Sequence, residues 1–263
     1  MPACPLVTVL LPVWNGASLP LTAGGEEPLR VAIRSLARQE PAPDAPVPSF
    51  EVLAVDDGST DGTAALLDVL AAEHPCLRVL HRPHEGLPGA LNAGLAAARG
   101  ALVARMDADD VCHPQRLALQ AAWMAAHPGT GLLATRVHFG GDRETARGFA
   151  HFVDWQNGLL DHEAISRNRF RDTPVSHPSV MFRRELPRLH GGYADGFFAE
   201  DWELWLRWLH AGVRMAKLPQ ELLVWNDPPR RATRSDSRYC EAANNRLRAL
   251  WLARWLERHN PWH

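Results

Sequence analysis

The strongest chemical signal in the sequence is an acidic cluster, Asp107, Asp109 and Asp110, which follows an apolar segment and precedes Pro114. Three carboxylates within four residues repel one another unless a cation or a proton offsets their charge. Oxygen ligands of this kind suit Mg²⁺ or Mn²⁺, which commonly bridge one or two carboxylates to phosphate oxygens. The cluster therefore predicts a metal site. The alternative is a solvated acidic group that favours the dipole of the next helix.

A second signal comes from Asp56 and Asp57, which end an apolar segment and are followed by a Gly-Ser-Thr turn sequence. A carboxylate at this position can accept a hydrogen bond from a nucleobase N–H group or a ribose hydroxyl. The same residue types favour a turn and a helix cap, with Ser59 or Thr60 as the capping residue. We expect the segment to serve both purposes.

A third signal is the pair Glu200 and Asp201, which begins a predicted helix beside Trp202 and Trp205. Acidic residues at a helix start normally complement the helix dipole. Transfer of a group to a hydroxyl, however, requires a general base that takes the hydroxyl proton. A carboxylate that opens a helix among aromatic residues is a candidate for that base.

Alternating strands and helices are predicted to position these carboxylates. Apolar, β-rich segments predict strands at 6–13, 50–55, 77–81, 101–106 and 131–139. Helices are predicted between them, at 28–38, 59–73, 88–99 and 114–126, with Gly100 as the C-terminal cap of the third. This alternation is typical of an α/β fold in which a mostly parallel sheet carries helices on both faces. Because ligands bind at the carboxyl ends of such strands, the acidic segments are expected to lie at one edge of the sheet.

The pattern is less regular after residue 140. The segment 140–171 is polar and predicts two short helices, and short strands are predicted at 179–182 and 222–225. Helices are predicted at 200–210 and 239–259, with a basic loop at 227–238 between the last strand and the final helix.

Composition narrows the class of protein. The chain has 263 residues, 46% of them hydrophobic, which is enough to bury a sizeable core. Its net charge of −2 argues against nucleic acid as the main partner, since binding a phosphate backbone needs a basic excess. Four scattered cysteines indicate neither a disulfide framework nor a zinc site. No signal peptide or membrane-spanning segment is evident, so a cytoplasmic protein is expected.

Six motifs together resemble glycosyltransferase family 2. They are VTVLLPVWN (7–15), DDGSTDGT (56–63), LNAG (91–94), ARMDADD (104–110), HPSVMFRR (177–184) and EDWELWLR (200–207). The resemblance implies a GT-A fold, a divalent metal and an inverting single displacement at an anomeric carbon. It also implies a nucleotide-sugar-binding half at 1–140, an acceptor and catalytic-base half of the same domain at 141–226, and a basic loop and C-terminal helix at 227–263.

The resemblance assigns donor contacts to the first motifs. Asp57 would contact the nucleobase, and Pro12 and Trp14 would line the same pocket. Many relatives have an Arg or Lys near the base, whereas the segment 85–91 contains none and Arg82 is the nearest candidate. A UDP-linked sugar is the expected donor, with TDP and GDP as the alternatives.

The resemblance assigns the chemistry to the later motifs. Asp107 would face the ribose and the metal-bridged phosphates, and Asp109 would be the metal ligand. Asp201 would be the catalytic base. The residues themselves support the same division, in which a metal serves the leaving diphosphate and a carboxylate serves the nucleophile.

Other polar residues are candidates for contacts to the acceptor or the diphosphate. Glu200 and His177 are two of them, although a hydrogen-bonded structural role suits His177 equally well. Arg231 and Arg234 lie in the basic loop, which is expected to close over the diphosphate or, alternatively, to be a solvated loop. Arg234 is assigned to the donor and Arg231 to the acceptor or the diphosphate.

Aromatic residues near the proposed base have two interpretations. Trp202, Trp205, Trp208 and Trp225 provide rings on which the apolar face of an acceptor sugar can stack, and Trp202 is the expected contact. Their helical spacing also predicts that at least two of the rings pack in the core. The final helix carries Leu, Trp and Arg residues, which suit packing on the domain, a dimer contact or peripheral binding to the inner face of a membrane.

Three functions are compatible with this pattern. The first is an inverting glycosyltransferase that uses a saccharide or lipid-linked acceptor in surface polysaccharide assembly. The second is a sugar-1-phosphate nucleotidyltransferase, which would need a Gly-rich phosphate loop with a basic residue, and the segment LPVWNG at 11–16 does not provide one. The third is a protein that binds nucleotide sugars without turnover, which the joint presence of Asp109 and Asp201 disfavours.

Overall fold

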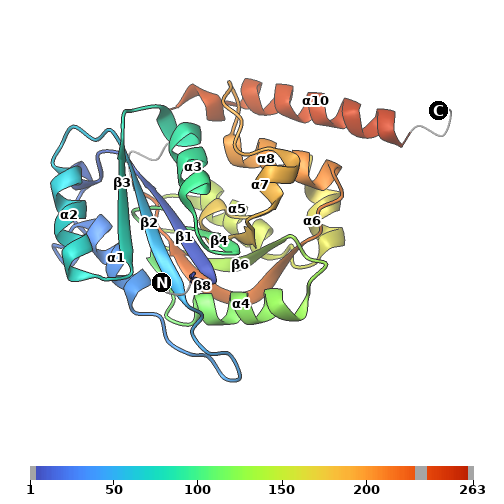
Figure 1. The fold of residues 1–263 in the computed structure, drawn as a ribbon. Coiled ribbons are helices and arrows are strands. Elements are labelled where there is room, and N and C mark those ends of the chain that lie inside the picture. Colours follow the sequence, from blue (N-terminus) through green and yellow to red (C-terminus); the bar gives the residue numbers. More distant parts are fainter. Residues whose placement is uncertain (1–3, 229–235, 260–263) are drawn as a thin grey trace.

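The computed structural model describes residues 4–228 and 236–259, and its centre is an eight-stranded sheet (Figure 1). The first half of the sheet is parallel and consists of β1 (Val7–Val13), β2 (Phe50–Asp57), β3 (Leu77–Arg82) and β4 (Leu102–Arg105). All seven residues of β1 are buried, as expected for a central parallel strand that is covered on both faces. These strands agree with the predicted ones.

The second half of the sheet is mixed. It contains β5 (Val111–Cys112), β6 (Leu132–Phe139), β7 (Met181–Arg183) and β8 (Met215–Trp225). β7 runs antiparallel to both β4 and β6, β8 is parallel to β6, and β5 is antiparallel to β8. The strand order is β3-β2-β1-β4-β7-β6-β8-β5.

Two features of this half differ from the sequence prediction. The strand predicted at 222–225 begins seven residues earlier, at Met215, because exposed residues 219–221 interrupt its apolar pattern while its pairing with β6 continues through register shifts. The two-residue strand β5 is too short to give a periodic signal. The predicted fold class, a mostly parallel α/β sheet flanked by helices with a C-terminal helix, is confirmed.

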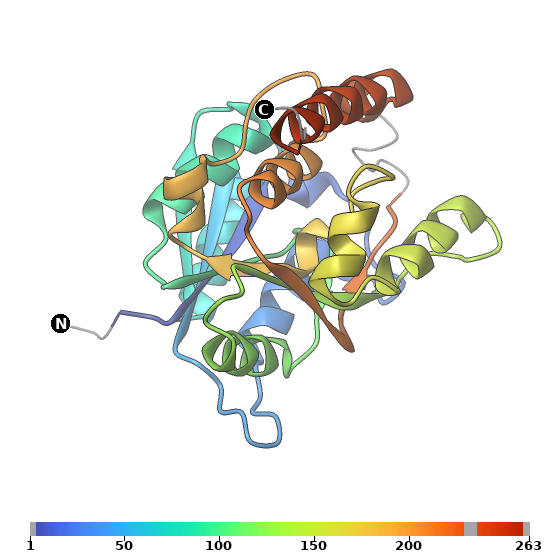
Figure 2. The ribbon, with the colours of Figure 1, turned by 90° about the vertical axis from the view of Figure 1, so that its right-hand side faces the viewer.

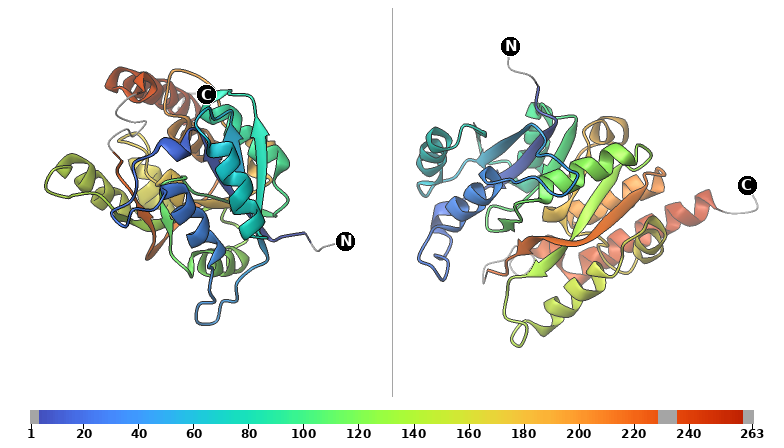
Figure 3. Two further views of the ribbon diagram at one scale, coloured as in Figure 1. Left: turned by 90° about the vertical axis from the view of Figure 1, so that its left-hand side faces the viewer. Right: turned by 90° about the horizontal axis from the view of Figure 1, so that it is seen from below.

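Helices cover both faces of the sheet (Figures 2 and 3). The helices of the described residues are α1 (Pro28–Ala37), α2 (Thr63–Glu73), α3 (Gly86–Ala97), α4 (Arg116–Ala126), α5 (Arg147–Asn157), α6 (His162–Asn168), α7 (Leu186–His190), α8 (Glu200–His210) and α10 (Glu241–Arg258). The same residues include single turns of 3-10 helix at η1 (Gly16–Ser18), η2 (His177–Ser179) and η3 (Ser237–Tyr239). The two short helices expected within 140–171 are α5 and α6.

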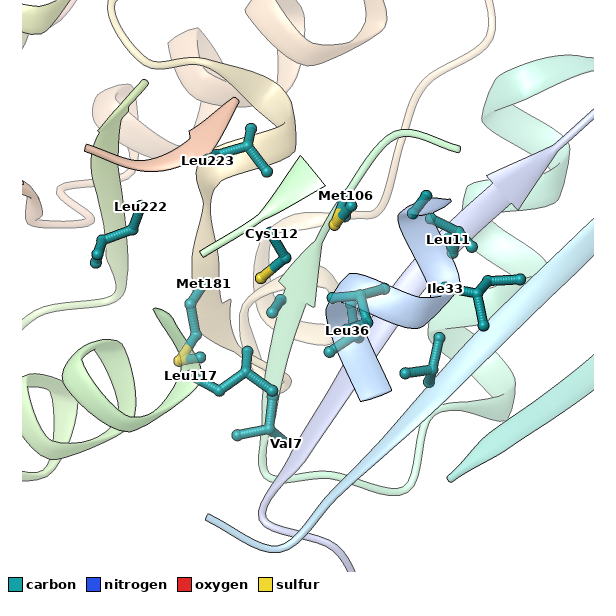
Figure 4. Close-up of a cluster of buried hydrophobic side chains, with 14 of the residues drawn as sticks. Val7, Leu11, Ile33, Leu36, Met106, Cys112, Leu117, Met181, Leu222 and Leu223 are labelled. Atoms are coloured by element: carbon teal, nitrogen blue, oxygen red, sulfur yellow. The ribbon is translucent and has the colours of Figure 1, made fainter. Parts of the chain in front are cut away.

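Alternate side chains of β1 enter two separate cores. Val9 and Leu11 point to a core that also contains residues of α1, α2 and α4. Leu10 points to the opposite core, which contains residues of α3 and α8. Figure 4 shows that the first core joins the two halves of the sheet, since Leu11 of β1 and Leu223 of β8 belong to the same cluster.

The last helix forms an outer layer. α10 lies across the outer side of α8 rather than on the sheet (Figures 1 and 2). Its buried residues Leu247 and Trp251 pack against Trp202 and Leu206 of α8. None of the helices within 4–228 and 236–259 is long and apolar enough to span a bilayer.

Two predicted helix caps are wrong. α2 begins after Gly62, and the Ser59 hydroxyl accepts a hydrogen bond from the backbone of Asn15 instead of capping the helix. α3 ends at Ala97, before Gly100. Gly100 donates a backbone hydrogen bond of 2.8 Å to the Thr8 hydroxyl, and a Cβ atom on Gly100 would lie 2.4 Å from the Thr8 backbone nitrogen. The glycine therefore permits a close approach of two backbone segments.

We expect Gly100→Ala to lower the free energy of unfolding by roughly 1–3 kcal/mol, because backbone atoms would have to move to admit the methyl group. Urea unfolding measures this change. Gly148→Ala is the matched control, since no atom lies within 4 Å of its added Cβ and its site in α5 favours alanine. Equal stability of the Gly100→Ala variant and the unaltered protein would contradict the packing argument.

Candidate active site

The acidic cluster forms a compact set of carboxylates at the end of β4. One carboxylate oxygen from each of Asp107, Asp109 and Asp110 lies within 4.8 Å of the others. Asp110 is buried, and its Oδ1 accepts a 2.9 Å hydrogen bond from the backbone N–H of Asn226. Its Oδ2 is also buried but accepts no hydrogen bond from any residue that the structure describes. Burial and the charges of Asp107 and Asp109 raise the pKa of Asp110 well above its ordinary value.

This arrangement fits a divalent cation. A buried carboxylate oxygen without a partner is costly unless a donor or a cation meets it. Three oxygen donors within one ion's reach are the chemistry that Mg²⁺ and Mn²⁺ accept, and a cation would offset the repulsion that raises the pKa of Asp110.

The end of β8 holds the acidic cluster in place. Besides its backbone bond to Asp110, Asn226 donates a 2.6 Å hydrogen bond from its side chain to the Asp109 carbonyl. The antiparallel pairing of β5 with β8 begins directly after Asp110, where Val111 lies opposite Val224. Asn226 was not predicted as a site residue, because it lies 116 positions from Asp110 and no local pattern marks it.

Arg105 places a positive charge directly behind the cluster. It is the last residue of β4, it is almost fully buried, and its guanidinium forms an ion pair with Asp107. Arg105 was not predicted as a site residue. The sequence does carry a signal for it, since a basic residue ends an otherwise apolar strand two positions before Asp107.

Glu200 and Asp201 open α8, where Glu200 is buried and Asp201 is partly exposed to the cavity. Asp201 Oδ1 accepts a 2.7 Å hydrogen bond from the backbone N–H of Trp202, and Glu200 Oε2 accepts a 2.6 Å bond from the Tyr239 hydroxyl. Burial, followed by the negative charge of Glu200, raises the pKa of Asp201 to about 7. Burial also raises the pKa of Glu200. A carboxylate with a pKa near 7 is suited to take up a proton under ordinary conditions.

His177 connects this pair to the core. Its Nε2 lies 2.8 Å from the Tyr193 hydroxyl, and its Nδ1 lies 3.8 Å from Glu200 Oε1. Burial, followed by the charge of Arg105, lowers the pKa of His177 well below its ordinary value, so the imidazole is neutral. The ring is hydrogen-bonded, as a structural histidine would be, and it also lines the cavity described next, as a substrate contact would. It therefore combines features of the two roles that the sequence left open.

A cavity of about 430 Å³ brings these groups together. Of the predicted residues, Asp107, Asp109, His177, Glu200, Asp201 and Trp202 all line it. Phe149, Phe152 and Trp225 form an aromatic part of the wall. Several polar lining residues were not predicted from the sequence, among them Asp172, Asn226, Tyr239 and Asn244.

The residues predicted to contact the nucleobase lie at the ends of β1 and β2, outside the lining of this cavity. Asp57 is buried and accepts 2.9 Å backbone hydrogen bonds from both Glu85 and Gly86. Trp14 is 57% exposed and stacks on His84 at a centroid distance of 4.8 Å. Pro12 is buried in β1, opposite Val55 of β2.

The remaining predicted residues have different outcomes. Trp205 and Trp208 are fully buried beside one another in the core, which agrees with the prediction that at least two of the tryptophans have a packing role. Arg82 forms a 2.9 Å ion pair with Glu85. Arg231 and Arg234 lie outside the described residues.

The profile of the family described as "Glycosyl transferase family 2" matches residues 8–187, about two thirds of the sequence. The chain belongs to glycosyltransferase family 2. The match includes the acidic cluster and ends before Glu200 and Asp201, so the family 2 profile covers one side of the cavity and not the whole of it.

Curated relatives support this membership. The amylovoran biosynthesis glycosyltransferase AmsE of Erwinia amylovora is 30% identical over 179 residues, which cover 66% of this chain and 63% of the relative. A UDP-Gal:alpha-D-GlcNAc-diphosphoundecaprenol beta-1,3-galactosyltransferase of Escherichia coli is 29% identical over 199 residues, with coverages of 74% and 67%. The match spans 63% of the length of AmsE and 50% of that of an uncharacterized glycosyltransferase of Haemophilus influenzae.

Solved structures share the fold of this family 2 chain. Residues 1–349 of S. aureus TarS in complex with UDP-GlcNAc have a TM-score of 0.67 at 18% identity, over 95% of this chain and 72% of the TarS 1–349 chain. The mannosyltransferase PcManGT of Pyrobaculum calidifontis, in complex with GDP-Man and Mn²⁺, has a TM-score of 0.65 at 22% identity, over 99% and 72%.

We expect Asp110→Asn to have opposite effects on the stability of the metal-free protein and on its stabilisation by Mn²⁺. Without metal, the variant should unfold a few degrees higher than the unaltered protein, since a repelled carboxylate has become a neutral amide that can still accept from Asn226. With Mn²⁺, its melting temperature should rise less than that of the unaltered protein. Differential scanning calorimetry measures both.

Asp154→Asn is the control for this comparison, because Asp154 is exposed and pairs only with Arg143 among its described ionic contacts. It should leave the response to Mn²⁺ unchanged. An equal Mn²⁺ response in the Asp110→Asn variant would count against a role of Asp110 in the metal site.

Proposed function

We propose that this protein is an inverting glycosyltransferase that moves a sugar from a nucleoside-diphosphate donor to an acceptor hydroxyl. The observation that carries the proposal is the shared cavity of the acidic cluster and the Glu200–Asp201 pair. The acidic cluster suits a divalent cation, and Asp201 is a partly buried carboxylate with a pKa of about 7. A metal-assisted leaving group and a general base are the two groups that such a transfer requires.

Asp107, Asp109 and Asp110 would hold the cation, with Asp109 as its main ligand. When bound, a divalent ion supplies positive charge to the phosphate oxygens of the leaving diphosphate. Asp107 would also face the donor ribose, while Arg105 keeps its carboxylate oriented through their ion pair. Asn226 holds the backbone of the cluster, so the ligands stay in position when no ion offsets their charges.

Asp201 would act as the base. Its carboxylate takes the proton of the acceptor hydroxyl while that oxygen forms a bond to the anomeric carbon of the donor. The bond between the anomeric carbon and the diphosphate oxygen breaks in the same step, and its electron pair leaves with the nucleoside diphosphate. Attack from the side opposite to the leaving group inverts the configuration of that carbon.

Asp57, Trp14 and Pro12 would form the nucleoside pocket at the ends of β1 and β2. Each Asp57 oxygen accepts one backbone hydrogen bond, and Oδ2 also lies 2.8 Å from the Nδ1 atom of His84. Oδ1 retains capacity for a second bond, from a base N–H. The exposed Trp14 ring, already stacked on His84, provides an aromatic surface beside it. A UDP-sugar is the proposed donor, supported by the UDP-Gal and UDP-GlcNAc named for the relative and for TarS.

The proposed setting is cytoplasmic assembly of a surface polysaccharide on a saccharide or lipid-linked acceptor. The names of the Erwinia and Escherichia relatives support it. The outer face of α10 also suits peripheral contact with an anionic membrane, because Leu250 and Leu256 are about half exposed there and Arg246 and Arg254 flank them.

Two other functions make different products. A nucleotidyltransferase would release pyrophosphate, and its basic phosphate loop is not found after β1, where η1 carries only Gly16, Ala17 and Ser18. A binding protein without turnover would release nothing. Incubation with UDP-, TDP- and GDP-sugars with and without Mn²⁺, followed by quantification of nucleoside diphosphate and pyrophosphate, separates the three.

We expect Asp201→Asn to lower the transfer rate at least a hundredfold, since an amide cannot accept the hydroxyl proton. Donor and Mn²⁺ affinities, measured by calorimetry, should stay within about twofold, because Asp201 is not one of the clustered carboxylates that would hold the cation. Asp195→Asn, an exposed site outside the cavity lining, is the control. Full transfer activity in the Asp201→Asn variant would remove Asp201 from the base role.

The transfer rate should also depend on pH through Asp201. The raised pKa of about 7 means that the carboxylate is protonated, and inactive as a base, below that pH. Activity should therefore increase about tenfold per pH unit below 7 and level off above it. A rate profile at saturating donor checks this, with donor affinity measured at each pH. A rate that is constant between pH 5 and 8 would be incompatible with the assignment.

A further inference from the structure

The C-terminal segment contributes to the cavity although it lies far outside the part that the family profile matches. The match ends at residue 187, whereas Tyr239 and Asn244 both line the cavity. The Tyr239 hydroxyl donates a 2.6 Å hydrogen bond to Glu200, the neighbour of the proposed base. Asn244 lies in the first turn of α10, and its Oδ1 is buried without a hydrogen-bond partner among the described residues.

Packing fixes the position of this segment. Leu247 and Trp251 of α10 pack on Trp202 and Leu206 of α8. Arg248 lies 5.6 Å from the centre of the Trp202 ring and donates a 2.9 Å hydrogen bond to the carbonyl of Arg171. α10 is therefore attached both to the helix that carries the base and to the segment that precedes Asp172.

Asp172 faces the cavity from that segment. Its Oδ1 accepts a 2.7 Å hydrogen bond from the Thr173 backbone, and the Thr173 carbonyl accepts a 2.9 Å bond from Gln156. The charge of Asp172 contributes to the raised pKa of Asp201, which shows that the two carboxylates are near each other. Burial raises the pKa of Asp172, and the charges of Arg171 and Arg248 oppose this rise, but neither arginine lines the cavity.

The charges of the side chains that line the cavity near Asp201 determine which kind of ligand it can bind. Among the described lining residues, Arg105 is the one cationic side chain, and it is paired with Asp107 on the side of the acidic cluster. Near the base, the wall presents the carboxylates of Asp172, Glu200 and Asp201 and the carboxamide of Asn244. Such a surface accepts hydrogen bonds from hydroxyls and repels phosphate or carboxylate groups.

We propose that Asp172 and Asn244 form the acceptor subsite, in which they accept hydrogen bonds from hydroxyls of an uncharged sugar residue beside Asp201. This inference rests on the proposed function and adds the class of acceptor to it. It also gives α10 a part in the selection of the substrate, in addition to its packing role.

The test uses the full chain with Mn²⁺ and UDP-glucose, UDP-galactose or UDP-N-acetylglucosamine. The acceptor probes are 4-nitrophenyl glycosides of neutral hexoses, compared with the matching uronides and 6-phosphates. Neutral glycosides should be glycosylated and the charged ones should not. Asp172→Asn and Asn244→Ala should each raise the KM for the neutral glycoside about tenfold or more, because each leaves a sugar hydroxyl without its partner.

Controls separate substrate selection from structural damage. The KM for the donor and the slow hydrolysis of the donor by water should stay within about twofold in both variants. Asn245→Ala, an exposed site in the same turn of α10, and Asp195→Asn, an exposed aspartate outside the cavity lining, should leave the acceptor KM unchanged. An unchanged acceptor KM in both cavity variants, or a preference for the charged glycosides, would overturn the proposal.

Failure of the proposed function would look different, since no nucleotide sugar would then be turned over even by water. Ligand-observed NMR with the same neutral glycosides decides the inference in that case. Binding that both cavity variants lose would support a neutral sugar site. Binding that is equal in the variants and the unaltered protein would reject it.

Discussion

The repulsion among three carboxylates at the end of β4 is the constraint on which the rest of the site depends. Asp107, Asp109 and Asp110 would separate if nothing held their backbone. The structure holds it from two sides, through the ion pair of Arg105 and through the hydrogen bonds of Asn226. The antiparallel pairing of β5 with β8 places Asn226 beside the acidic loop, where its two hydrogen bonds hold the loop backbone.

The site lies where the two halves of the sheet meet. The parallel half ends at β4, which supplies Arg105 and the acidic loop, and its parallel connections require helices on both faces. The mixed half provides η2, which carries His177, and β8, which is followed by the Asn226 that bonds to the acidic loop. α8 packs on the same core as β4 and β7, and its first residues, Glu200 and Asp201, line the same cavity as Asp107 and Asp109.

The proposed donor site and the proposed acceptor site come from different parts of the chain. The part of the chain that matches the family profile supplies the acidic cluster and the proposed nucleoside pocket. The part beyond it supplies the proposed base and, through η3 and α10, two of the side chains that surround it. The proposed donor contacts therefore lie on segments held by central parallel strands, whereas part of the proposed acceptor subsite lies on α10, an outer layer that packs on α8 and bonds to the Arg171 carbonyl. Outer layers of this kind can change with little effect on the core.

The sequence by itself determined the strands and helices of the first 140 residues except the two-residue strand β5, because buried parallel strands and amphipathic helices leave periodic apolar patterns. It also identified the acidic cluster and the Glu200–Asp201 pair, since carboxylates next to apolar segments are locally conspicuous. Only the tertiary structure decided that Asp172, Asn226, Tyr239 and Asn244 share one cavity with them. It also decided which tryptophans are core residues and how β8 pairs. The reason is that contacts such as Asp110 with Asn226 join residues more than a hundred positions apart, and no local periodicity records which distant segments a fold brings together.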